Sequence, residues 1–139
     1  MNCIRILRCT VVLLLLSAVP SQAETAFVGI PSRQATAGPK KAEAQDVRNP
    51  SEALVVISRV DEKWQWTSRE DRPLVKLRSG IYFLFIDPQG GGYIKMVNPE
   101  FSSLADEEYT YVEHLITGIG SISYWGKGRD VHSELLNLP

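Results

Sequence analysis

Between residues 54 and 67, the order of apolar and polar positions predicts a β-hairpin. Leu54–Val60 is rich in β-branched residues, which favour strands, and residues 63–67 (KWQWT) alternate with the period of two expected of a half-buried strand. Asp61 and Glu62 stand between the two segments and can form the turn, although they are not the Asn-Gly pair most typical of a tight hairpin.

The next segments continue the same pattern. Leu74–Arg78 alternates as a short strand, and 81–86 (IYFLFI) is an unbroken apolar and aromatic run. Such a run predicts a central strand that is covered on both faces. Residues 87–92 (DPQGGG) are a strong turn signal, and Tyr93–Val97 returns as a further strand.

After residue 100 the apolar period changes. Apolar side chains recur every three or four positions over 103–117, Ser103 can cap a helix, and Gly118 suits its end. A helix is therefore the first interpretation, and a strand remains open because residues 109–112 (YTYV) are strand formers. We also predict a last strand at 118–125 and a short terminal helix at 129–136.

Together these elements predict an α+β fold. We expect an antiparallel β-meander of about five to six strands packed by one main helix, following a signal peptide and a disordered arm.

The first 23 residues resemble a secretory signal. Arg5 and Arg8 precede the apolar run 11–18 (VVLLLLSA), and small residues at 21 and 23 fit a cleavage site after Ala23. The alternative is an uncleaved anchor, but the run is much shorter than the roughly 20 apolar residues of a membrane span. We therefore expect export to a periplasm or the extracellular medium, and no transmembrane segment in the mature chain.

The remaining chain divides at about residue 50. Residues 24–50 are mostly Ala, Gln, Pro, Lys and Ser with one aromatic residue, Phe27, which is typical of a disordered arm or linker. All other aromatic residues fall between Trp64 and Trp125. We therefore expect a small globular domain over 51–139.

Composition and charge exclude several classes of function. The net charge of the 139 residues is −1, so nothing favours nucleic-acid binding. Both cysteines lie in the predicted signal, so the mature chain has no thiol nucleophile, disulfide or cysteine metal site. His114 and His132, the only histidines, lack any recognised metal-ligand spacing, and we expect neither a metal nor a cofactor.

Two sets of residues are candidates for a site. If the protein is an enzyme, His114 is the better placed general base, and Glu113 is the carboxylate nearest to it in sequence. For binding, the aromatic residues are the natural anchors, and Trp64 and Trp66 share one face of their strand. If that face of the strand is covered by the rest of the domain, the two indoles belong to the core. If it faces water, they can form a platform for a partner or an apolar ligand. The full set of candidate binding residues is Trp64, Trp66, Tyr111, Tyr124 and Trp125.

The first hypothesis for function is a small exported binding protein, such as an envelope accessory factor, an inhibitor or an immunity-type protein. Its partner would be another exported or envelope protein, or a small apolar ligand. Two alternatives remain open: a small exported isomerase, cyclase or hydrolase that uses His114, and a structural component of an envelope assembly.

Overall fold

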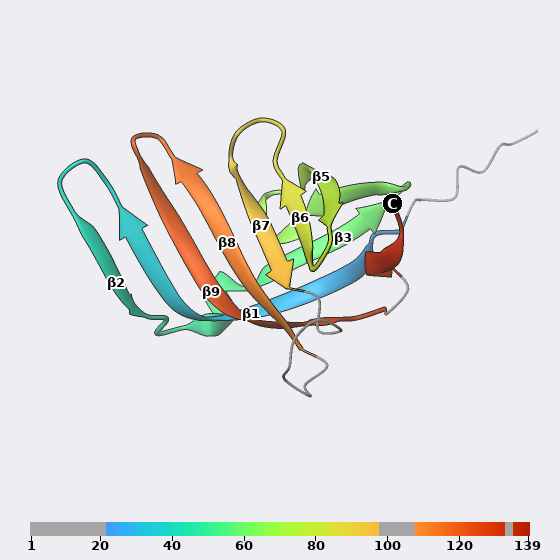
Figure 1. The fold of residues 1–139 in the computed structure, drawn as a ribbon, viewed down its shortest axis with the longest axis horizontal. Helices are drawn as coiled ribbons and strands as arrows, with labels where there is room; N and C mark the ends of the chain where they lie inside the picture. The colour runs from blue at the N-terminus through green and yellow to red at the C-terminus, as the bar shows by residue number, and fades with distance from the viewer. Residues whose placement is uncertain (1–21, 98–107, 133–134) are drawn as a thin grey trace, which may run out of the picture.

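The computed structural model describes residues 22–97, 108–132 and 135–139, and these residues form one antiparallel sheet (Figure 1). Its strands, in chain order, are β1 (Glu24–Ala37), β2 (Ala42–Asp46), β3 (Val55–Val60), β4 (Lys63–Trp66), β5 (Arg72–Ser79), β6 (Tyr82–Ile86), β7 (Gly92–Val97), β8 (Tyr109–Thr117) and β9 (Gly120–Asp130). Three short 3-10 turns accompany them: η1 (Pro50–Ala53), η2 (Thr67–Arg69) and η4 (Leu135–Asn137).

Eight of the strands close into a barrel. Each strand from β3 to β9 pairs with the next along the chain, and β1 closes the ring by pairing with β3 on one side and β9 on the other. The 14 residues of β1 make this possible: 24–29 face β3, and 27–37 face β9. The last part of β1 also pairs with β2, which lies beside the barrel (Figure 1).

Large side chains fill the interior of the barrel. Phe27, Trp66, Phe83, Phe85 and Tyr111 are almost completely buried. Aromatic rings meet edge to face, as Trp64 and Phe85 do at 5.2 Å between centroids. The inside is therefore a packed core, consistent with an eight-stranded barrel, whose lumen is just wide enough for side chains.

The C-terminus covers one end of this core. Leu135 and Leu136 of η4 are buried, and the indole Nε1 of Trp64 donates to the carbonyl oxygen of Pro139 at 3.3 Å. The ammonium of Lys76 donates to the carbonyl oxygens of Leu136 and Leu138. This end is therefore capped by the chain itself.

The predicted α+β class is wrong: the chain is nearly all β, and its described residues contain no α-helix. The main helix expected over 103–117 is replaced by β8, whose buried residues alternate from Tyr109 to Glu113. Residues 98–107 lie outside the described part of the chain. In 109–112 the strand preference of the β-branched and aromatic residues outweighs the helical spacing of the apolar positions, because alternate side chains of a strand can fill the barrel. The short helix expected over 129–136 is also absent where it can be seen: β9 continues to Asp130, and η4 begins at Leu135.

The prediction of a disordered arm over residues 24–50 is wrong as well. Residues 24–37 form β1, and Ala26 and Phe27 are completely buried. The ring of Phe27 meets the rings of Tyr109 and Tyr111 at 6.1 and 5.7 Å. The order of this segment comes from its neighbours β3 and β9, which lie far away in the sequence.

The hairpin turns agree with the sequence. Asp61 and Glu62 connect β3 to β4 with φ of 47° and 65°, the left-handed pair that a two-residue hairpin requires. Residues 87–92 connect β6 to β7, with left-handed Gly90 and, at φ of 139°, Gly92. The predicted signal peptide falls almost wholly on residues 1–21, outside the described residues. None of the helices in the described residues is long and apolar enough to cross a membrane.

Candidate functional site

One end of the barrel is polar, and its centre is a buried ion pair. Glu113 points inward from β8 and is completely buried, and its Oε2 accepts a hydrogen bond from Nη2 of Arg69 at 2.7 Å. The indole Nε1 of Trp66 donates to Oε1 of the same carboxylate at 3.0 Å. Arg69 comes from η2, between β4 and β5, and also donates to the backbone oxygen of Ser68. We call this end of the barrel, formed by residues 68–72, 87–91 and 115–118, the mouth.

Burial shifts the proton equilibria at the mouth. Removal from water raises the pKa of Glu113 to about 7, against the opposing effects of the Arg69 charge and of the hydrogen bonds from Arg69 and Trp66. Burial also raises the pKa of Tyr111 well above its usual range, and the negative charge of Glu113 adds to this shift. Glu113 is therefore a carboxylate that can gain or lose its proton near neutral pH.

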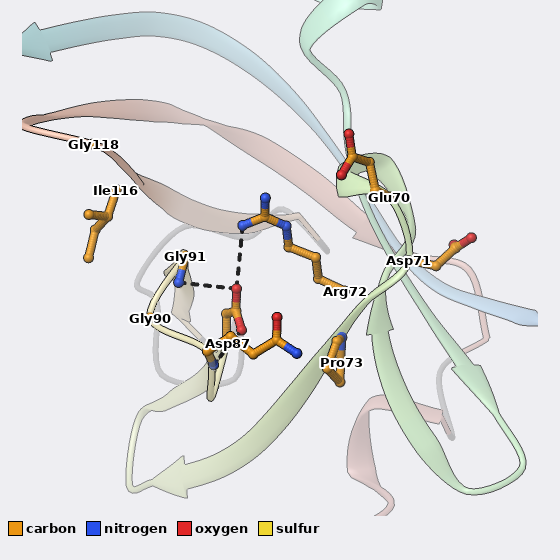
Figure 2. A pocket seen from close by; sticks show the side chains of 10 residues that line it. Glu70, Asp71, Arg72, Pro73, Asp87, Gly90, Gly91, Ile116 and Gly118 are labelled. Atoms are coloured by element: carbon orange, nitrogen blue, oxygen red, sulfur yellow. Dashed lines mark hydrogen bonds and ion pairs between the residues drawn. The ribbon is translucent and has the colours of Figure 1, made fainter.

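The mouth also holds a second pair of charges, Arg72 and Asp87 (Figure 2). Asp87 is almost completely buried, and its carboxylate accepts hydrogen bonds from the backbone N–H groups of Gln89 and Gly91. Oδ2 of Asp87 also lies 3.5 Å from Nη1 of Arg72, at the start of β5. A Cβ atom at Gly91 would stand 2.2 Å from that Nη1 and 2.3 Å from Oδ2. A side chain at this position would therefore displace Arg72 or Asp87.

Both arginines border cavities. Arg69 and Arg72 line a cavity of about 240 Å³ together with Ser68, Leu115 and Thr117. A neighbouring open cavity of about 600 Å³ is lined by Arg72, Asp87, Glu70 and Asp71 among others (Figure 2). Glu70 and Asp71 have φ of 59° and 53°, a left-handed conformation that is uncommon for these residues. The mouth thus carries fixed charges of both signs.

The outer surface of the barrel has a different character over β5–β9. Direct cross-strand partners form one row across β5, β6 and β7 (Val75, Ile86, Tyr93) and a second across five strands (Leu77, Leu84, Lys95, Val112, Trp125). We call the apolar members of these rows the apolar outer face: Val75, Leu77, Leu84, Ile86, Tyr93, Val112 and Trp125.

This face is only partly shielded by its own neighbours. Val75 is 49% exposed, Leu77 48%, Trp125 38% and Tyr93 37%, while Leu84, Ile86 and Val112 are half-buried. The outer side of an antiparallel sheet is normally polar. The unbroken run 81–86 predicted a strand covered on both faces. Its inner residues, Phe83 and Phe85, are indeed buried, whereas its outer residues are only half-buried.

One cation lies within the apolar outer face. Lys95 stands at the centre of the second row, with its Nζ 4.0 Å from the centroid of the Tyr82 ring. No acidic residue occupies an outward position on the described parts of β5–β9, and no described carboxylate forms an ion pair with Lys95.

The structure separates the two residues proposed for catalysis. Glu113 points into the barrel, while His114, its neighbour on the strand, points outward, where Nδ1 lies 2.8 Å from Oγ of Ser123 and the ring stacks on Tyr93 at 5.2 Å between centroids. They therefore cannot act on one substrate. The contact between His114 and Ser123 is a cross-strand pair outside the described cavities.

The candidate aromatic anchors are also separated. Trp64, Trp66 and Tyr111 lie in the core, whereas Trp125 lies on the apolar outer face. Tyr124 is half-buried and lines a further cavity of about 490 Å³ beside β2. Of the five, only Trp125 is thus an exposed aromatic side chain.

Sequence reasoning missed the charges of the mouth and the extent of the outer face. Arg69 and Arg72 stand between two predicted strands and Asp87 in a predicted turn, and only the barrel brings them together. The run 81–86 did signal an apolar outer side, but its neighbours on that side follow only from the strand register.

Comparisons of the chain with protein-family models, with curated proteins and with solved structures give no match. The function must therefore be inferred from the residues themselves.

Proposed function

We propose that this chain is a small exported binding protein and that it binds another exported protein through the apolar outer face. The observation that carries the proposal is the exposure of neighbouring apolar side chains, among them Val75, Leu77 and Trp125, on the outside of a barrel whose core is already complete. Contiguous apolar surface of this kind typically marks an interaction site. Trp and Tyr are also the residues most enriched among the anchors of protein interfaces.

The packing of the interior favours a protein partner over a small apolar ligand. Trp66, Phe83 and Phe85 occupy the space that a hollow barrel would offer to such a ligand. The larger cavity at the mouth is lined largely by charged and polar groups. An apolar face that crosses several strands suits the apolar core of an interface with another protein.

Lys95 defines the chemistry of that partner. An interface that buries the face would desolvate the ammonium group, which is costly unless a carboxylate meets it. The described outward positions of β5–β9 offer no carboxylate, and the same face of a second copy would bring another lysine. We therefore expect a partner with an apolar surface and an aspartate or glutamate within it.

Capture from the native exported fraction tests this proposal. The purified full chain serves as bait beside Leu77→Glu and Lys95→Glu, which place a negative charge on the face. Lys63→Glu is the matched control, because Lys63 is an exposed lysine on β4, outside the apolar outer face. Circular dichroism on each bait confirms that the fold is retained.

The expected result is one protein that is retained by the wild-type chain and by Lys63→Glu, and is lost with Leu77→Glu and Lys95→Glu. Lys95→Arg should retain it, since the positive charge is preserved. Equal capture by all variants would refute the proposed face. A dimer of the chain in solution that is lost with Leu77→Glu would show instead that the face binds a second copy.

A further inference from the structure

The smaller cavity of the mouth brings two guanidinium groups to one space. Arg69 is held from behind by Glu113, and Arg72 by Asp87, so both side chains are positioned before any ligand arrives. Both line the cavity of about 240 Å³, together with Ser68, Thr117 and the acidic Glu70. Such a volume is smaller than the range of roughly 300 Å³ or more that is typical of drug-sized ligands, so it suits a single small group.

The donors of these arginines are only partly used. Nε of Arg69 is buried and has no hydrogen-bond partner among the described residues. A buried N–H without an acceptor is uncommon and costly, so a small shift of Arg69 toward an acceptor in the cavity would relieve this cost. Arg72 uses Nη1 for Asp87, and its side chain is still 42% exposed.

We propose that this cavity binds a small oxyanion group, either a carboxylate or a tetrahedral oxyanion such as sulfate, between Arg69 and Arg72. The planar fork of a guanidinium matches such groups with two parallel hydrogen bonds. The site lies at the end of the barrel and not on the apolar outer face, so this inference does not depend on the proposed function.

The acidic rim restricts the class of ligand. Glu70, which lines this cavity as well as the larger one beside it, and Asp71, which lines the larger one, are both exposed and would repel a polyanion such as a nucleic acid or a polyphosphate. A single oxyanion can reach the arginines with less repulsion, because water and salt screen the charges of exposed side chains.

The proton on Glu113 controls how strongly Arg69 attracts an anion. In the part of the chain that the structure describes, the charged group that acts on Glu113 is Arg69, and the neutral Trp66 and Tyr111 lie beside it. When Glu113 is ionised, it neutralises Arg69 and repels the incoming anion. When Glu113 is protonated, Arg69 retains its full charge toward the cavity. The anion should therefore bind more tightly at pH 6 than at pH 8.

An NMR titration of the full chain tests the site directly. Sulfate and acetate are the probes, because neither changes its charge between pH 6 and pH 8, and the backbone amide signals of Ser68, Gly91 and Thr117 report binding at the mouth. We expect saturable shifts at pH 6 with at least one of the two probes. The preferred probe distinguishes a tetrahedral from a planar oxyanion.

Substitution on β5 supplies a matched pair. Arg72→Gln should weaken binding roughly tenfold or more, as expected when a hydrogen bond to a charged group is lost. Arg78→Gln, on the same strand but at the opposite end of the barrel, should leave it unchanged. If Arg72→Gln loses the native spectrum, Arg72→Lys keeps the charge without the planar fork and should still weaken sulfate binding several-fold.

The proton linkage has its own variant. Glu113→Gln should bind the anion with the same affinity at pH 6 and pH 8. The absence of saturable shifts for both probes, or equal weakening by Arg72→Gln and Arg78→Gln, would overturn the proposed site. Wild-type affinity that does not change between the two pH values would overturn the role of Glu113.

Discussion

Replacing Phe27 by Ala should remove a large part of the stability of the barrel. Phe27 is completely buried, and its ring packs edge to face with Tyr109 and Tyr111. It also lies over Gly128, where a Cβ atom would stand 2.3 Å from the ring. The neighbours therefore cannot collapse into the space that the ring vacates without moving β9.

The expected loss follows from that packing. Burial of a phenylalanine that is replaced by alanine typically contributes about 3 to 5 kcal/mol to the free energy of unfolding. At about 4 °C per kcal/mol, a value suited to a domain near 100 residues, the thermal midpoint should fall by about 12 to 20 °C.

Urea unfolding followed by tryptophan fluorescence, together with thermal circular dichroism, measures both quantities. Ile30→Ala is the control: it changes another apolar residue of β1, but Ile30 is 56% exposed and the loss should stay within about 0.5 kcal/mol. If Phe27→Ala cost no more than Ile30→Ala, β1 would not belong to the core and the closed barrel would be wrong.

Four further outcomes follow from the polar end and from β1. Burial raises the pKa of Glu113 from 4.5 to about 7, so between these pH values the folded state holds a proton that the unfolded state has lost. The free energy of unfolding should therefore fall as pH rises through this interval. Urea titrations at several pH values measure this slope, and Glu113→Gln should abolish the part of it that Glu113 causes. Trp66→Phe removes a hydrogen bond that favours the ionised carboxylate, so the same decline should move to higher pH; an unchanged profile would show that this bond does not act on Glu113. Gly91→Ala should cost about 1 to 3 kcal/mol, because the methyl group separates Arg72 from the buried Asp87, and a change below about 0.5 kcal/mol in chemical unfolding would contradict that close packing. Deleting 24–37 should abolish cooperative thermal unfolding, since β3 and β9 would both lose their partner, whereas retained cooperativity would restore the interpretation of this segment as an arm.

The local pattern of apolar and polar residues was sufficient to predict most strands and turns of the meander. Alternation at 63–67 and the turn at 87–92 each reflect contacts between residues close in sequence, and the structure has strands and hairpins near the predicted positions. The same reasoning failed for 24–37, because little in the composition of that segment favours a strand. The segment is ordered because it pairs with β3 and β9. Such pairing between distant segments cannot be predicted from the hydrophobic period or the strand propensity of 24–37 alone.

The error at 103–117 has a related cause. Over a short segment, apolar residues at spacings of three and four do not exclude a strand, and the buried positions of β8 are in fact spaced by two, at Tyr109, Tyr111 and Glu113. Glu113 was a further obstacle, because a glutamate is expected at the surface. Here the buried position is stabilised by Arg69 and Trp66, and neither partner can be identified without the barrel.

Photo-crosslinking from single positions tests the central claim, binding through the apolar outer face, most directly. A photoreactive phenylalanine derivative is placed at Leu77, which is 48% exposed on β5, and in a separate variant at the exposed Lys63 of β4. In the native exported fraction, position 77 should crosslink to one other protein, and excess wild-type chain should suppress that product while excess Lys95→Glu should not. Equal crosslinking from both positions, or products from 63 alone, would contradict binding through this face.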